Sequence, residues 1–119
     1  MSRSFGNYIC ERRLSKGLSL REFSKLIGIS PEYLSKIEHG QRAAPKDSIV
    51  EKIADSLSLN QIERESLLDL AAQSQTRKTL AKDLVDYIYN HKYILIVLRT
   101  AKRRGAGDKE WKKILDNIL

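Results

Sequence analysis

Two short helical segments that meet at a glycine constrain the fold of this chain more than any other feature. The first begins at residues 19–22, Ser-Leu-Arg-Glu, where a hydroxyl and a carboxylate three positions apart can satisfy the free amides of a helix start. Gly28 interrupts this segment. Ser30 and Pro31 then start a second helix, with serine as its cap and proline at its first position, and Gly40 ends it. Two capped short helices around a glycine turn are the sequence form of a helix-turn-helix.

Apolar residues at helical spacing run through the rest of residues 1–73 and predict five helices around one core. The sequence therefore indicates an all-α protein whose first 73 residues form a domain of their own. The residues that we expect to face its core are Phe5, Tyr8, Ile9 and Leu14; Phe23, Leu26 and Ile27; Leu34 and Ile37; Ile49, Val50, Ile53, Ala54 and Leu57; and Ile62, Leu67, Leu68 and Leu70.

A polar segment at 74–79 is the candidate linker to a helical extension at 80–119. Residues 93–98 are six consecutive apolar residues, which favours a helix but leaves a strand open. A break at 105–108 precedes a last helix whose apolar residues share one face. These apolar stripes favour a homodimer interface, or one for another protein partner, and Trp111 fits such a seam better than it fits base stacking.

The charge distribution indicates a polyanionic partner. The net charge is +7, but residues 1–76 carry 11 basic and 10 acidic side chains, whereas residues 77–119 carry 11 basic and 5 acidic ones. DNA affinity in the first part must therefore come from the placement of individual charges. The basic run at 99–104 fits either contacts to DNA phosphates or a solvated helix face.

Composition excludes several classes of function. No run of 18 apolar residues predicts a membrane span, and the first residues lack a signal-peptide core. Cys10 has no partner for an internal disulfide, and His39 and His91 cannot complete a zinc site. Two histidines on turns offer no catalytic pocket. We expect a cytoplasmic protein that is not an enzyme and has no cofactor, no metal and no membrane association.

The chain closely resembles the XRE family of bacterial and phage regulators. The resemblance rests on Leu-Ser-Leu-Arg-Glu-Phe-Ser at 18–24, Gly-Ile-Ser-Pro at 28–31, and Tyr-Leu-Ser-Lys-Ile-Glu-His-Gly-Gln-Arg at 33–42. It covers about residues 5–72 and implies the compact five-helix, lambda-repressor-like DNA-binding domain of that family.

The resemblance also implies roles for single residues. Three positions match those that touch base edges: Pro31, Glu32 and Lys36. Eight match or flank backbone-contacting positions: Arg12, Ser19, Arg21, Ser30, Tyr33, His39, Gln41 and Arg42. Arg13 and Glu38 match a structural ion pair. The alternatives that remain are Arg12 on a solvated helix face, Lys36 as a surface lysine, Tyr33 as a packing residue and Glu38 as an unpaired acid.

The sequence departs from the family pattern just after Ser19, where the family usually has glutamine. Here the residue is Leu20, which cannot donate a hydrogen bond. Either Arg21 takes over the contact to the DNA backbone, or that contact is lost.

The function implied is sequence-specific regulation of transcription, as a repressor that binds double-stranded DNA at a palindromic operator as a homodimer. The alternative is an antitoxin of a toxin–antitoxin pair, which neutralises a toxin through residues 80–119 and autoregulates its operon.

Overall fold

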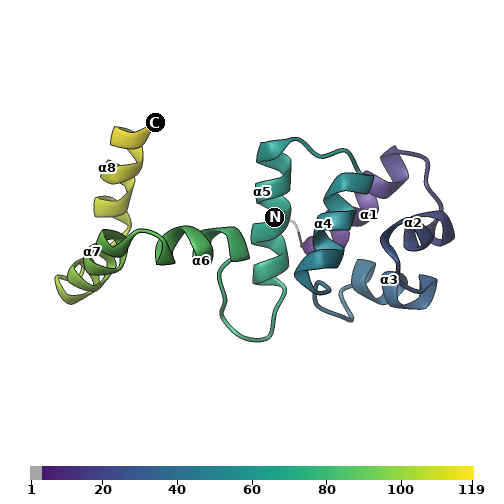
Figure 1. Cartoon of the computed structure of the whole chain (residues 1–119), viewed down its shortest axis with the longest axis horizontal. Coiled ribbons are helices and arrows are strands. Elements are labelled where there is room, and N and C mark those ends of the chain that lie inside the picture. The colour runs from purple at the N-terminus through teal and green to yellow at the C-terminus, as the bar shows by residue number, and fades with distance from the viewer. Residues whose placement is uncertain (1–3) are drawn as a thin grey trace. The chain divides into compact units, whose positions relative to one another are not determined.

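The computed structural model describes residues 4–119, and these residues form helices joined by turns and loops, with no strand among them. The all-α prediction is confirmed. The helices are α1 (Phe5–Ser15), α2 (Leu20–Ile27), α3 (Pro31–Glu38), α4 (Asp47–Ser56), α5 (Gln61–Gln73), α6 (Lys82–Tyr89), α7 (Lys92–Arg103) and α8 (Asp108–Ile118) (Figure 1). The chain divides into two compact units, Met1–Asp83 and Leu84–Leu119.

The helix starts of the first unit follow from local sequence. Ser19 Oγ accepts from the Glu22 amide and Glu22 Oε1 accepts from the Ser19 amide, each at 3.0 Å, so the capping box at α2 is complete. Ser30 Oγ accepts from the Tyr33 amide at 3.1 Å and caps α3. Gly28, at φ 77°, is left-handed and makes the turn between them.

One core fills the first unit. α1 packs on α3 and α5, α2 packs on α3 and α4, and α4 packs on α5. The largest fully buried apolar side chains come from all five helices: Ile9, Phe23, Ile27, Leu34, Ile37, Val50, Ile53 and Leu67. This packing holds α2 and α3 against the rest of the domain and leaves one face of α3 exposed to solvent.

Three residues expected in the core are instead exposed, namely Leu14, Leu26 and Ile62, at 61%, 56% and 75%. Leu14 lies nine residues after Phe5, which at about 3.6 residues per turn places it on the opposite side of α1. The inward position there is taken by Arg13, which is buried. Helical spacing identified the helices correctly but not the limits of their buried faces.

Gly6 brings the backbones of α1 and α3 together. A Cβ atom at Gly6 would lie 2.2 Å from the carbonyl oxygen of Ile37 and 2.9 Å from that of Glu38. Only a residue without a side chain allows this approach. The C-terminal end of α3 is therefore packed directly on the first turn of α1.

The first unit continues beyond its expected end at residue 73. Ser74 Oγ accepts from the Ala44 amide at 2.9 Å, and Gln75 Nε2 donates to the Ala44 carbonyl at 3.3 Å. Ala81 is buried, and the compact unit runs to Asp83. The start of the expected linker, at 74–79, is thus fastened to the first unit by side-chain contacts that composition does not reveal.

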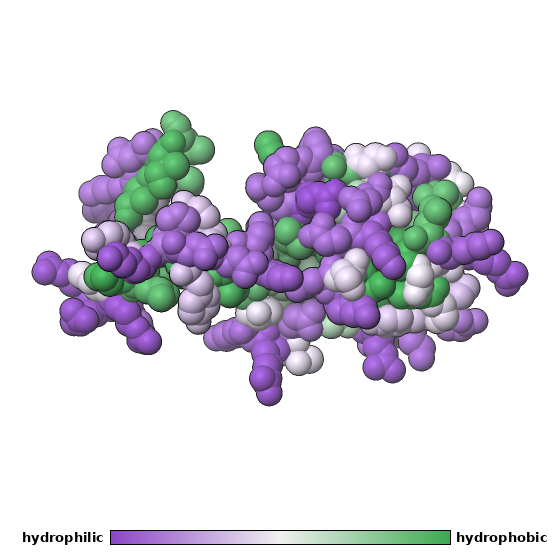
Figure 2. Space-filling model, viewed as in Figure 1, coloured by the Kyte–Doolittle hydropathy of each residue, from purple (hydrophilic) through white to green (hydrophobic). Residues whose placement is uncertain are grey.

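The second unit is helical but has no core of its own. Residues 93–98 lie within α7, so the strand alternative is wrong. All residues from 84 to 119 are described, and none of them is buried. Apolar side chains along α8 are visible as a stripe in Figure 2. Amphipathic helices of this kind are stable only when their apolar faces are covered.

Candidate nucleic-acid interface

α3 has one face in the core and one face open to solvent. Leu34 and Ile37 are buried, whereas Glu32 and Lys36 are exposed. Pro31, at the first helical position, is partly buried. The helix is therefore anchored from behind and presents an acid and a base from its outer face. This is the arrangement that reading of base edges in the major groove requires.

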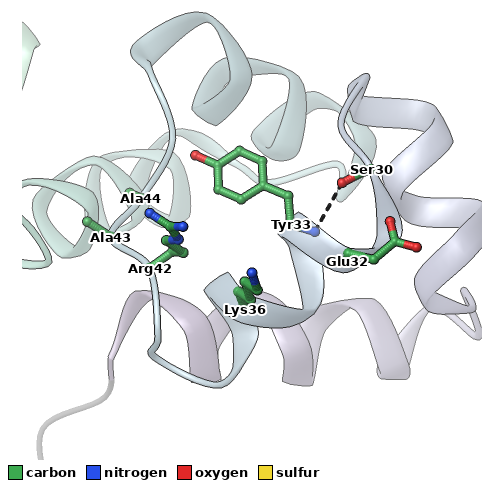
Figure 3. A pocket seen from close by; sticks show the side chains of 7 residues that line it. All are labelled: Ser30, Glu32, Tyr33, Lys36, Arg42, Ala43 and Ala44. Atoms are coloured by element: carbon green, nitrogen blue, oxygen red, sulfur yellow. Dashed lines mark hydrogen bonds between the residues drawn. The ribbon is translucent and has the colours of Figure 1, made fainter.

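An open pocket of about 540 Å³ lies where α3 meets the loop that follows it. Tyr33 and Lys36 project from α3, and Arg42, Ala43 and Ala44 come from the loop (Figure 3). Ser30 and Glu32 complete the lining. Five residues that the sequence singles out for DNA contacts, Ser30, Glu32, Tyr33, Lys36 and Arg42, are thus brought together in space. The two alanines were not expected, since alanine carries no chemical signal.

Arg13 and Glu38 tie α1 to α3 by a buried ion pair. Arg13 Nε and Nη2 donate to the two Glu38 carboxylate oxygens at 2.8 and 3.0 Å, and Nη1 donates to the Leu18 carbonyl at 2.8 Å. The side chains are 10% and 3% exposed. The hydrogen bonds to Glu38 raise the pKa of Arg13, so the guanidinium stays charged.

The remaining candidate backbone contacts lie on exposed positions. Ser19 caps α2, and Arg21 lies in its first turn. His39 caps the end of α3, with Nδ1 2.7 Å from the Ser35 carbonyl oxygen. Gln41 follows on the exposed turn.

Arg12 is engaged within the domain. Its guanidinium pairs with the Glu63 carboxylate and lies 5.2 Å from the centre of the Tyr8 ring. Desolvation is the largest single effect and lowers the pKa of Arg12, but the hydrogen bond that Arg12 donates to Glu63 and its further interactions with Tyr8 and Glu63 together outweigh it, so the pKa of Arg12 is raised. A phosphate would have to compete with Glu63 for this side chain.

The departure at Leu20 also has a structural reason. Leu20 is partly buried and packs against the core instead of facing solvent as a donor would. The position contributes apolar packing, and Arg21 is the exposed cation beside it.

The described residues contain neither a metal-binding cluster nor a membrane-spanning helix. Between residues 4 and 119, no three His, Cys, Asp or Glu side chains gather where they could hold a metal ion. In the same range, no helix has the length and apolar character needed to cross a membrane.

An exposed polar helix, held on a second helix by a glycine turn and anchored by a buried ion pair, defines a helix-turn-helix DNA-binding domain. Residues 11–64 match the family model described as helix-turn-helix, so this part of the chain is similar to that family and to the XRE-type regulators that the sequence resembles. That family is one of DNA-binding regulators, and the match supports a DNA-binding transcriptional regulator.

Two similar proteins were found beyond the family model. An uncharacterized HTH-type transcriptional regulator of Bacillus subtilis (strain 168), RghRB, is 28% identical over 102 residues, which are 86% of this chain and 69% of the relative. A solved structure of a SinR protein/SinI protein complex matches with a TM-score of 0.48 and 26% identity, and the match covers 95% of this chain and 92% of the solved one.

Proposed function

We propose that this protein represses transcription by binding an inverted-repeat operator as a homodimer. The observation that carries the proposal is the pocket in which Glu32, Tyr33, Lys36 and Arg42 converge on the open face of α3. A helix with this exposed polar face and a buried apolar face fits the major groove, which is about 12 Å wide.

Base recognition is assigned to the exposed face of α3, which runs from Pro31 in its first turn to Lys36 in its last turn. The Lys36 ammonium donates to guanine O6 and N7, and the Glu32 carboxylate accepts from cytosine N4. Pro31 meets base edges by apolar contact. Both charged side chains are exposed and line the same pocket, which supports their action on neighbouring base pairs.

Backbone recognition is assigned to the residues around these three. Arg42 and the Ser30 hydroxyl flank α3 and donate to phosphates, with Tyr33 between them in the pocket. The other contacts to the backbone are assigned to Ser19, Arg21, His39 and Gln41. Such contacts fix the orientation of the domain without reading sequence.

Dimerisation is assigned to the second unit, and its proposed partner is a second copy of the chain. α6, α7 and α8 contain no buried residue. Large apolar side chains are exposed on them, including Leu95, Ile96, Val97 and Leu98 on α7 and Ile114, Leu115 and Ile118 on α8. Monomers seldom leave such a patch uncovered. Two-fold pairing would bury it and bring two α3 helices to one operator, whose half-sites lie about 34 Å apart, one turn of DNA.

Selection of DNA sequences in vitro tests the proposal. The full-length protein is expected to enrich an inverted repeat, and Lys36→Ala is expected to relax one base pair in each half-site at a cost of about 1–3 kcal/mol. Lys109→Ala, on an exposed position of α8, removes the same charge and serves as the control. An unchanged motif with Lys36→Ala contradicts the assignment, and enrichment of a single half-site contradicts the dimer.

Repression is tested with the selected operator placed across the promoter of a reporter gene. Expression is expected to fall when the protein is present and to recover with Lys36→Ala. An increase in expression would identify an activator. If the protein stays monomeric until a co-expressed neighbouring protein binds residues 80–119, the antitoxin alternative is favoured.

A further inference from the structure

The loop that carries Arg42 is held by side chains from the end of α5. Ser74 Oγ accepts from the Ala44 amide at 2.9 Å and donates to the Ala71 carbonyl at 2.7 Å. Gln75 Nε2 donates to the Ala44 carbonyl at 3.3 Å. Both backbone polar groups of Ala44 are thus satisfied by residues some thirty positions further along the chain.

Ala44 needs these partners because it is buried and lies between helices. It is 8% exposed, and residues 41–46 belong to neither α3 nor α4. A buried backbone amide outside regular structure must find another acceptor, because leaving it unpaired destabilises the fold. Ser74 is that acceptor, and it is itself fixed by Ala71 in α5.

The position of Ala44 affects the pocket directly. Ala44 lines it, two residues after Arg42, together with Tyr33 and Lys36 from α3 (Figure 3). Arg42 is exposed, so its side chain has no packing of its own to hold it in place. Its backbone is defined by α3 on one side and by the fastened Ala44 on the other.

We propose that Ser74, assisted by Gln75, is a positioning residue for DNA binding, which holds the 41–45 loop so that Arg42 meets a phosphate beside the bases that α3 reads. The inference rests on the proposed function of Arg42. Because Ser74 acts through a backbone contact, its loss lowers affinity for every DNA sequence alike and leaves base preference unchanged.

The test compares full-length Ser74→Ala, Ser74→Thr, Arg42→Ala and the Ser74→Ala/Arg42→Ala double variant on the selected operator and on random DNA, over a range of salt concentrations. Ser74→Ala is expected to weaken binding to both DNAs by about fivefold, because DNA binding must then order a loop that has lost one ordinary hydrogen bond. The slope of log affinity against log salt is expected to fall toward that of Arg42→Ala, by up to about 0.9. Ser74→Thr keeps the hydroxyl and is expected to restore both values.

The double variant separates positioning from general destabilisation. If Ser74 acts through Arg42, Ser74→Ala has no further effect once Arg42 is alanine. Additive losses of affinity would overturn the inference, as would a changed base preference in Ser74→Ala. Gln75→Ala removes the longer, part-buried bond to Ala44 together with the contact to the Ala71 carbonyl, and it is expected to give a smaller loss of the same kind.

Failure of this inference can be told from failure of the proposed function. If Arg42→Ala weakens DNA binding and Ser74→Ala does not, Ser74 has no positioning role and the proposed function stands. If the wild-type protein binds no DNA, both the proposed function and the positioning role of Ser74 are wrong. Melting temperatures of all variants, measured in parallel, show that each affinity belongs to a folded protein.

Discussion

The guanidinium of Arg13 and the carboxylate of Glu38 meet through two parallel hydrogen bonds, at 2.8 and 3.0 Å, inside the first unit. Because Glu38 is the last residue of α3, this contact fixes the end of the helix that carries the candidate base-reading residues. Fold stability and the orientation of that helix therefore depend on the same two side chains.

Glu38→Gln is expected to lower the free energy of unfolding by about 3–5 kcal/mol, because it leaves the Arg13 charge buried without its counter-charge. Thermal or denaturant unfolding measures the effect. Glu32→Gln is the matched control, since Glu32 is an exposed acid on the same helix. Equal melting temperatures for the two variants would show that the pair contributes nothing.

Arg12→Ala is expected to lower the melting temperature slightly and to leave the salt dependence of DNA binding unchanged. The reason is that Arg12 already pairs with Glu63 and lies over the Tyr8 ring. Arg42→Ala, on the exposed loop, is the comparison and should reduce the salt slope by about 0.9. If Arg12→Ala reduces the slope as much, Arg12 contacts phosphate as the sequence predicts.

Acid is expected to destabilise the protein through its capping glutamates. The Ser19 amide lowers the pKa of Glu22, and the Asn60 amide lowers that of Glu63, below the usual 4.5. A carboxylate with a lowered folded pKa stabilises the protein above its unfolded pKa, and this stability is lost as the pH falls through the folded value. The stability that these two carboxylates contribute is therefore lost at pH values below 4.5.

The Glu22→Gln/Glu63→Gln double variant tests this dependence. Its amide oxygens still accept from the cap amides but do not titrate in this range. Melting temperature is expected to fall less steeply with acid in the variant than in the wild type. An equally steep fall would place the acid sensitivity elsewhere in the molecule.

The full-length protein is expected to sediment as a dimer, and Leu115→Asp is expected to make it a monomer with weak operator affinity. Leu115 is a large apolar residue of α8 that is 49% exposed, and an acid there cannot be buried in an interface. Asn117→Asp, on an exposed polar position of the same helix, is the control. A chain that ends at Asp83 is expected to remain folded and monomeric, because it keeps Ser74, Gln75 and the buried Ala81.

Sequence reasoning predicted the features that depend on neighbouring residues. The caps at Ser19 and Ser30 and the turn at Gly28 follow from short-range hydrogen bonding and backbone geometry. The Arg13–Glu38 pair was implied only by resemblance, since no local rule joins residues 25 positions apart.

The features that escaped prediction depend on tertiary packing. Leu14 and Ile62 fit the apolar spacing of their helices but lie outside the buried faces, because spacing does not say how much of a helix its neighbours cover. The bond between Ser74 and Ala44 joins a polar segment to a loop, and each looks solvated when read alone. The sequence does not indicate that Ala43 and Ala44 line a pocket, because alanine has no functional group that marks it as part of a site.

The contact at Gly6 has a consequence for how this sequence can vary. Gly17, Gly40 and Gly105 have left-handed backbones but open space around them, so asparagine, which tolerates that conformation, is an acceptable replacement there. Gly6 has no such freedom, because two backbone carbonyls occupy the space of any side chain. In a library that replaces every residue in turn, selected for operator binding, Gly6 is expected to be the glycine that accepts no substitute, although alanine there would favour the helix. Functional sequences of this lineage are therefore expected to diverge more freely at the outer face of α3, where operators are told apart, than at the glycine on which that helix rests.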